Sequence, residues 1–237
     1  SVPTDNPIAG SLMYSYGHRN PQGLTYGNGK IYSSEHGAND NDEINIIEPN
    51  KNYGWPSVRG YCDNQNTTET NFCNSNTVTA PIWSSGNSAT EAVAGLDYYP
   101  ANGAVTVLQN SLLMVSLKFS TSRGRDLRVY KLSANGTTIM SETVLFNNTF
   151  GRMRDICVSP AGDIYVSTSN YDGRFGATIP ANDDRIIKLK YTKLTTALEE
   201  NSENEALKIH PNPVNDVLHI NYPNNEKVSL MNTDGSG

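Results

Sequence analysis

Basic and amide side chains stand beside several of the strands that the sequence predicts. Two of them directly precede Pro21, which cannot donate to a sheet and disfavours a helix before it, so they are expected at a strand end. One follows an apolar strand, and two alternate ahead of another strand, where a period of two places them on the same side. If these strand ends meet on one face, they form a pocket for an anion, whereas each alone is typical of a solvated surface. The set is Arg19, Asn20, Lys118, Arg152 and Arg154.

The segment 35–43, EHGANDNDE, combines acidic residues with Gly and Asn. This composition suits a turn that offers carboxylate and carbonyl oxygens to a hard cation such as Ca²⁺, although it does not match an EF-hand loop. An acidic surface turn without a metal is the alternative. The acidic residues are Glu35, Asp40, Asp42 and Glu43.

An internal repeat indicates which elements carry these residues. Segments that begin at Gly23, Gly95 and Asp155 each open with a short alternating strand, a second strand returns after a turn or insertion, and a third follows. Recurrence at about 60–70 residues predicts an all-β fold, a β-propeller with long loops, because typical blades run to about 40–50 residues. A Greek-key sandwich is the alternative. The later strands are expected at 30–34, 43–47, 111–117, 127–132, 163–167 and 185–191.

Length and charge limit the classes of partner. The chain has 237 residues and a formal net charge of −6, which disfavours a long polyanion such as DNA. It contains no run of about eighteen apolar residues that would predict a membrane span, and no charged-then-apolar signal sequence opens it. Because the start, SVPTDNP, lacks an initiator Met, we expect it to lie within a longer protein.

Three cysteines are present, and two of them could pair. Cys62 and Cys73 lie eleven residues apart in a polar stretch, whereas Cys157 sits in an apolar run. A disulfide between the first two would stabilise their loop by roughly 2–3 kcal/mol in the chain-entropy model and would fit an oxidising compartment. Two unpaired loop thiols are the alternative.

The C-terminal part of the chain has a different composition. Residues 195–206 are acidic and poor in apolar side chains, which predicts a linker instead of a packed helix. The linker separates a first domain, 1–194, from a tail, 207–237, in which strand alternation returns. A tail of about thirty residues is too small to fold stably alone, so we expect it to be cut short.

Five motifs together resemble a known family. GHRNPQGL, SEHGANDNDEINII, NYGWPSVRGY, SLK and RMRDICVSPAGDIYVSTSN look like successive segments of the soluble dehydrogenases of glucose and aldose sugars that depend on pyrroloquinoline quinone (PQQ). The resemblance runs from about Ser1 to Leu194. That family is a six-bladed propeller, and the chain resembles its C-terminal half, which implies a partial propeller of about three blades with a short C-terminal β tail.

The resemblance also implies a site. PQQ is an ortho-quinone with three carboxylates, and a Ca²⁺ polarises the carbonyl carbon that accepts hydride. The family pattern assigns five residues to the cofactor's carboxylates and quinone oxygens, namely Arg19, Asn20, Lys118, Arg152 and Arg154, and lets His36 line the cofactor pocket. It assigns the carbonyls of Gly37 and Ala38 to this Ca²⁺, and Glu43 and Tyr53 to a structural calcium. Most relatives have Pro in place of Ala38.

The implied activity is oxidation of aldose sugars at C1 to the lactone, with electrons passed to an acceptor that the sequence does not identify. The general-base His of the family belongs to its N-terminal half, so no catalytic residue is assigned and this chain alone is expected to be inactive. A homodimer of the full-length parent is a possible assembly. The alternatives are a non-catalytic propeller of the same superfamily that binds a protein or glycan, and a calcium-stabilised structural module.

The tail has a resemblance of its own. LKIHPNPVNDVLHI is similar to the opening of the C-terminal sorting domain of the type IX secretion system, and the match breaks off before that domain's later strands. It implies a secreted, periplasmic or outer-surface protein of a Gram-negative bacterium. The oxidising compartment that a disulfide would need agrees with this expectation.

Overall fold

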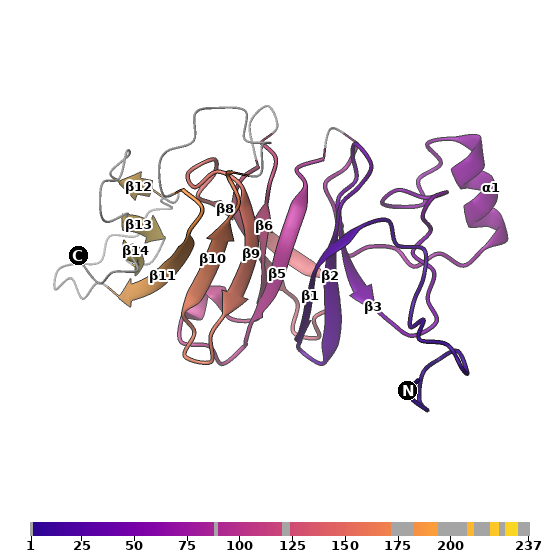
Figure 1. Ribbon diagram of the computed structural model, residues 1–237, viewed down its shortest axis with the longest axis horizontal. Coiled ribbons are helices and arrows are strands. Elements are labelled where there is room, and N and C mark those ends of the chain that lie inside the picture. The colour runs from indigo at the N-terminus through magenta and orange to yellow at the C-terminus, as the bar shows by residue number, and fades with distance from the viewer. Residues whose placement is uncertain are drawn as a thin grey trace.

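The computed structural model describes residues 2–87, 90–119, 124–171 and 183–193, together with three short strands near the C-terminus. Figure 1 shows three antiparallel sheets that stand side by side. In the first two sheets, all four strands pair with their neighbours in chain order. In the third sheet, the first three strands in the chain pair in this order. Such a meander is the arrangement of a propeller blade. The first blade comprises β1 (Pro21–Gly27), β2 (Lys30–Glu35), β3 (Glu43–Ile47) and β4 (Trp83–Ser84).

The other two blades repeat this arrangement. The second comprises β5 (Val93–Tyr99), β6 (Ser111–Ser116), β7 (Leu127–Leu132) and β8 (Ile139–Leu145), with a 3₁₀ turn at Thr106–Leu108. The third begins with β9 (Met153–Val158), β10 (Ile164–Thr168) and β11 (Ile186–Lys193). It continues outward through β14 (Glu226–Met231), β13 (His219–Tyr222) and β12 (Lys208–His210), so strands of the C-terminal tail extend this blade. The predicted linker 195–206 lies outside the described residues.

The strands predicted from the repeat are confirmed to within two residues at each end. Sequence reasoning missed β4, β8 and a helix, α1 (Thr67–Ser75). The strand β8, IMSETVL, has three consecutive exposed residues at its centre. It is the outermost strand of its blade, and its residues do not alternate between buried and exposed.

The first strand of each blade packs against the first strand of the next, β1 against β5 and β5 against β9. Glycine permits both close approaches. A Cβ at Gly23 would lie 2.5 Å from the backbone N of Leu96, and a Cβ at Gly95 would lie 2.6 Å from the Cα of Asp155. The glycine that opens two of the repeats therefore allows neighbouring inner strands to meet backbone to backbone.

A carboxylate also joins the three inner strands. Asp97 of β5 accepts hydrogen bonds from Thr25 Oγ1 of β1 at 2.8 Å and from the backbone N of Val158 of β9 at 2.7 Å. Hydrophobic cores fill the spaces between the blades, and an apolar cavity without charged lining residues lies between the second and third. The first core includes Tyr32, Ile44, Leu112 and Tyr130, and the second includes Leu113, Leu127, Met153 and Ile164.

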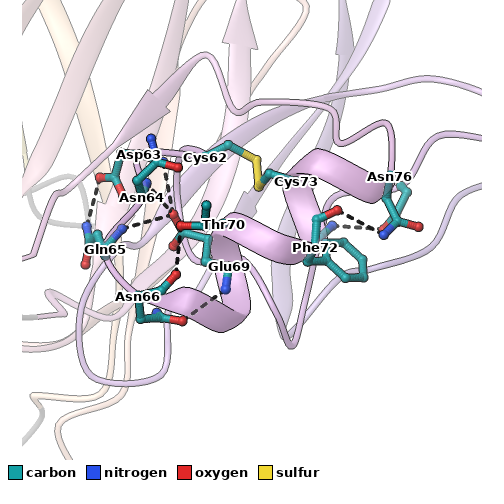
Figure 2. Close-up of a disulfide and its surroundings, with 12 residues drawn as sticks. Cys62, Asp63, Asn64, Gln65, Asn66, Glu69, Thr70, Phe72, Cys73 and Asn76 are labelled. Atoms are coloured by element: carbon teal, nitrogen blue, oxygen red, sulfur yellow. Dashed lines mark hydrogen bonds between the residues drawn. A yellow bond between two sulfur atoms is a disulfide. The ribbon is translucent and has the colours of Figure 1, made fainter.

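An excursion between β3 and β4 carries the helix α1, which Figure 2 shows in detail. The predicted disulfide between Cys62 and Cys73 is confirmed, and it ties the preceding turn to the helix. Asn66 caps the helix by accepting from the backbone N of Glu69 at 3.0 Å. The buried Glu69 carboxylate in turn accepts the backbone N–H groups of residues 63–65. Among the described residues, no helix is long and apolar enough to cross a membrane.

Candidate functional site

The predicted cofactor-binding residues lie along one edge of the three blades, which we call the site edge. At this edge the first strand of each blade begins and the second strand ends. In the first blade Pro21 pairs with Glu35, and in the third Met153 pairs with Thr168. In the second blade the start of β5 pairs with the end of β6 in the same way. Strand ends that are distant in the sequence therefore reach the same side of the molecule. The residues at this edge are Arg19, Asn20, His36, Lys118, Arg152 and Arg154.

Arg19, Asn20 and His36 contact one another where β1 begins and β2 ends. Arg19 Nη1 donates to the carbonyl oxygen of His36 at 3.2 Å, and its guanidinium lies 5.4 Å from the centre of the Trp55 ring. Asn20 Nδ2 lies 3.4 Å from His36 Nδ1, and the His36 N–H donates to the Asn20 carbonyl at 3.1 Å. Because Arg19 is exposed, an anionic ligand could reach its positive charge.

The pKa of the His36 imidazole depends on its burial and on the charges around it. Burial lowers its pKa, and the positive charges of Arg19 and Arg154 lower it further, while Asp42 and the Val93 backbone act in the opposite direction. Nε2 of the ring is buried. No group of the described residues, not even the Val93 carbonyl, meets hydrogen-bond geometry with it. The lowered pKa favours the neutral ring, whose Nε2 could contact a ligand. The charge of Arg154, in the third blade, therefore acts electrostatically on a residue of the first.

The two arginines of the third blade have different surroundings. Arg154 is exposed, and its Nε donates to Ser169 Oγ at 3.2 Å. Arg152 is only 7 % exposed, and its Nη1 donates to the carbonyl oxygen of Leu117 at 2.8 Å. This contact joins the third blade to the second beside Lys118. The structure thus gives Arg152 a buried, blade-joining contact, and its role as a cofactor ligand stays a prediction.

A chain of hydrogen bonds links Lys118 to the acidic loop. The Lys118 N–H donates to the Glu91 carbonyl at 2.9 Å, and the Glu91 N–H donates to Asp42 Oδ2 at 2.7 Å. The fully buried Asp42 also accepts from the Gly37 N–H at 2.9 Å and from Thr90 Oγ1 at 2.6 Å. Protein donors therefore satisfy Asp42, which holds the loop 37–42 against the segment that supports Lys118.

One small pocket brings predicted cofactor and metal residues together. At its rim, a Cβ at Gly37 would lie 1.6 Å from the Asp40 carbonyl oxygen, so this tight turn requires glycine. The carbonyls of the turn are therefore fixed by backbone geometry. The predicted residues that line the pocket are Arg19, His36, Gly37, Ala38, Glu43 and Tyr53, and Trp55 joins them.

The two residues assigned to a structural calcium already have protein partners. Glu43 accepts from the Gly60 N–H at 2.7 Å and from Asn45 Nδ2 at 2.9 Å, and burial raises its pKa to about 7. The Tyr53 hydroxyl donates to the Ile46 carbonyl at 2.5 Å. In the part of the chain that the structure describes, no three His, Cys, Asp or Glu residues gather in a way that could hold a metal. A cation here would depend largely on backbone carbonyls.

Sequence reasoning gave no role to Trp55, although its segment NYGWPSVRGY contributes to the resemblance. Its ring lies beneath the Arg19 guanidinium and lines the same pocket. The spacing along the chain contains no signal for this contact, since Trp55 belongs to the excursion after β3. Only the folded arrangement brings it to the start of β1.

Comparison with known proteins places this geometry in context. A sequence model of the family described as Glucose / Sorbosone dehydrogenase matches residues 1–177. Quinoprotein glucose dehydrogenase B of Acinetobacter calcoaceticus is 47% identical over 76 residues, which are 30% of this chain and 16% of that protein. An aldose sugar dehydrogenase of Escherichia coli is 29% identical over 191 residues, which are 76% of this chain and 48% of that protein.

Solved structures agree in fold. The PQQ-bound aldose sugar dehydrogenase of Streptomyces coelicolor superposes with a TM-score of 0.58 at 31% identity, over 78% of this chain and 47% of that one. A glucose dehydrogenase-like oxidoreductase of Thermus thermophilus gives a TM-score of 0.57, also at 31% identity, over 78% of this chain and 50% of that one. The chain spans half the length of these proteins or less. The match across 177 residues shows that it belongs to the Glucose / Sorbosone dehydrogenase family.

Proposed function

We propose that this chain contributes the cofactor-binding part of a sugar dehydrogenase that depends on PQQ and Ca²⁺. The observation that carries the proposal is the convergence of basic side chains from three blades on the site edge, with Arg19 and Arg154 both close enough to lower the pKa of His36. The relative of known structure from S. coelicolor binds PQQ, which supports the same ligand here.

The residues present fit a cofactor with three carboxylates. Arg19, Lys118 and Arg154 are exposed at the site edge, so an anionic ligand can reach their charges from solvent. The partnerless Nε2 of His36 provides one more polar contact in the pocket. The rigid turn at Gly37 would direct the Gly37 and Ala38 carbonyls to a Ca²⁺, a cation that prefers oxygen ligands.

The proposed reaction oxidises a cyclic aldose at C1. When bound, PQQ would accept the hydride that leaves C1 while the C1 hydroxyl proton passes to a base, which gives the lactone and the reduced quinone. In this chain, the basic side chains would hold the cofactor and His36 would remain neutral beside it. We propose that the base comes from a part of the protein outside this chain, and that the whole protein is needed for turnover.

A protein- or glycan-binding propeller is the second candidate, and the site edge argues against it. A module that binds only through its surface has no need for basic residues of three blades along one edge, two of which act on the His36 ring. Binding of PQQ by the chain separates the two candidates, because it does not require turnover.

The test is a titration of the chain with PQQ in Ca²⁺ and in excess chelator, followed by the quinone absorbance. We expect saturable binding with one PQQ per chain, weakened at least tenfold by the chelator. Arg154→Ala should weaken binding about tenfold, since a lost charge-assisted contact is worth about 1.5 kcal/mol. Lys188→Ala, which removes a positive charge from the middle of β11, is the matched control and should bind like the wild type. If PQQ does not bind, the proposal is wrong.

We also propose that the tail 207–237 serves in secretion. Deletion of the tail from the full-length parent should keep the protein inside the cell, and a PQQ titration checks that the third blade tolerates the loss of β14. Normal export of the shortened protein would contradict this role.

A further inference from the structure

Glu35 occupies a central position at the end of β2. Its side chain is buried, and one carboxylate oxygen, Oε1, accepts the backbone N–H groups of both Arg19 and Asn20, the latter at 3.0 Å. The other oxygen, Oε2, lies 3.1 Å from His18 Nδ1. A carboxylate that accepts three hydrogen bonds fixes its donors more strongly than a neutral acceptor would.

The two backbone groups need this acceptor. They precede Pro21, the first residue of β1, and neither donates to a backbone carbonyl of the described residues. The carboxylate of Glu35 takes the place of a backbone acceptor at the strand entrance. The direction in which the chain enters β1 therefore depends on a side chain of the neighbouring strand.

His18 holds the carboxylate from the far side. Its Nε2 lies 2.9 Å from Ser15 Oγ, and its ring stacks on Tyr53 with centroids 4.4 Å apart and planes 25° apart. Since a carboxylate only accepts, Nδ1 of His18 carries the proton in this contact. A continuous series of contacts thus runs from Ser15 through His18 and Glu35 to the Arg19 and Asn20 backbone.

The backbone position of Arg19 and Asn20 determines where their side chains lie in the site. Arg19 extends over Trp55 and donates to the His36 carbonyl, and Asn20 approaches the His36 ring. A change of the backbone angles at 19 and 20 would move both side chains away from His36 together. Their placement requires that the two N–H groups stay bound.

We propose that Glu35, oriented by His18, is a positioning residue that sets the Arg19–Asn20 dipeptide for the ligand of the site edge. The inference rests on the proposed function for the identity of that ligand, PQQ. Glu35 also borders the small pocket, but this role does not require it to touch the cofactor. It acts through the backbone of the two residues that do.

The test compares Glu35→Ala with Asp97→Asn in the full chain. Asp97 is the matched control, because it too is a carboxylate that ties strands together, at the centre of the blades instead of the site edge. We expect Glu35→Ala to raise the Kd for PQQ at least tenfold, and Asp97→Asn to lower the melting temperature while the Kd stays within twofold of the wild type. An unchanged Kd in folded Glu35→Ala, or an equal rise in Asp97→Asn, would overturn the inference.

Two further variants protect the test if Glu35→Ala does not fold. Glu35→Gln keeps one acceptor oxygen but presents an amide to His18, and His18→Phe keeps the ring on Tyr53 while it removes the Nδ1 donor. Both should give Kd values between those of the wild type and Glu35→Ala. Wild-type Kd values in both folded variants would overturn the inference.

A readout without cofactor separates this inference from the proposed function. Amide hydrogen exchange at Arg19 and Asn20 should accelerate at least tenfold in Glu35→Ala, which removes their acceptor, and exchange across β6 should not change. If the wild type binds no PQQ but these amides behave as expected, the proposed function fails and the positioning role survives. If the exchange rates of both amides do not change, the positioning role is contradicted, whether or not PQQ binds.

Discussion

Arg128 and Arg154 have the same side chain and opposite surroundings. Arg128 of β7 is fully buried, and its guanidinium pairs with Glu91, with Asp126 at 3.0 Å and with Glu142 at 3.3 Å. Arg154 at the start of β9 is exposed at the site edge. Position along the strand separates the two roles: an arginine within a buried strand stabilises the blade, and one at the strand's open end can hold a ligand.

The largest expected effect is on stability. Arg128→Met should lower the free energy of unfolding by about 3–5 kcal/mol, because it leaves buried carboxylates without their cation. Urea denaturation followed by tryptophan fluorescence measures the loss. A loss below about 1 kcal/mol would show that Arg128 is no more structural than a surface residue and would remove the contrast with Arg154.

Arg152 tests the boundary between the two roles. Arg152→Met should cost about 1.5–3 kcal/mol of stability, because the Leu117 carbonyl loses a charged donor in a buried place. Denaturation and PQQ titration of the same variant measure both roles. If stability is unchanged and PQQ affinity falls as in Arg154→Ala, Arg152 is a ligand residue and its buried contact is incidental.

Arg154→Ala should leave stability within about 0.5 kcal/mol of the wild type, as exposed substitutions do. It should also raise the pKa of His36, because the positive charge that opposes protonation is removed. An NMR titration of the His36 ring measures this shift, and Arg128→Met in folded protein provides the contrast. A His36 pKa that does not move in Arg154→Ala would place Arg154 away from the pocket.

A pH dependence of stability is expected from Glu43. Its pKa, raised to about 7 by burial, exceeds the value in an unfolded chain, so the folded state binds more protons between these two values. Stability should therefore fall as the pH rises towards 7. If Glu43 binds Ca²⁺, the ion should abolish this decline. Denaturation at several pH values with and without Ca²⁺ measures it, and a decline that Ca²⁺ does not alter would argue against Glu43 as a ligand.

The periodicity of the sequence predicted the fold more completely than it predicted the contacts. Alternation and turn residues placed the inner strands, because those strands are buried on defined faces. The outer strand β8 was not predicted, because its buried and exposed residues do not alternate. The helix α1 escaped because it is short and polar and is held by a cap and a disulfide instead of an apolar face.

The sequence predicted the candidate site as a set of residues at strand ends. It did not predict the hydrogen bonds that hold these strand ends in place. Arg19 contacts His36, and the charge of Arg154 acts on the His36 ring, while the cofactor roles of these residues stay predictions. The roles of Glu35 and Asp42 as hydrogen-bond acceptors for distant backbone groups could not be predicted, because they depend on which strand ends become neighbours. An acidic loop has the same sequence pattern whether its carboxylates face a metal or backbone amides.

The most direct test of the central claim is to map bound PQQ on the chain by amide chemical shifts in the presence of Ca²⁺. The largest shifts should fall at residues 19–20, 36–38, 118 and 154, which belong to three blades and meet only at the site edge. Shifts confined to one blade, or spread over the opposite edge where β2 and β6 begin, would contradict a common site for an anionic cofactor.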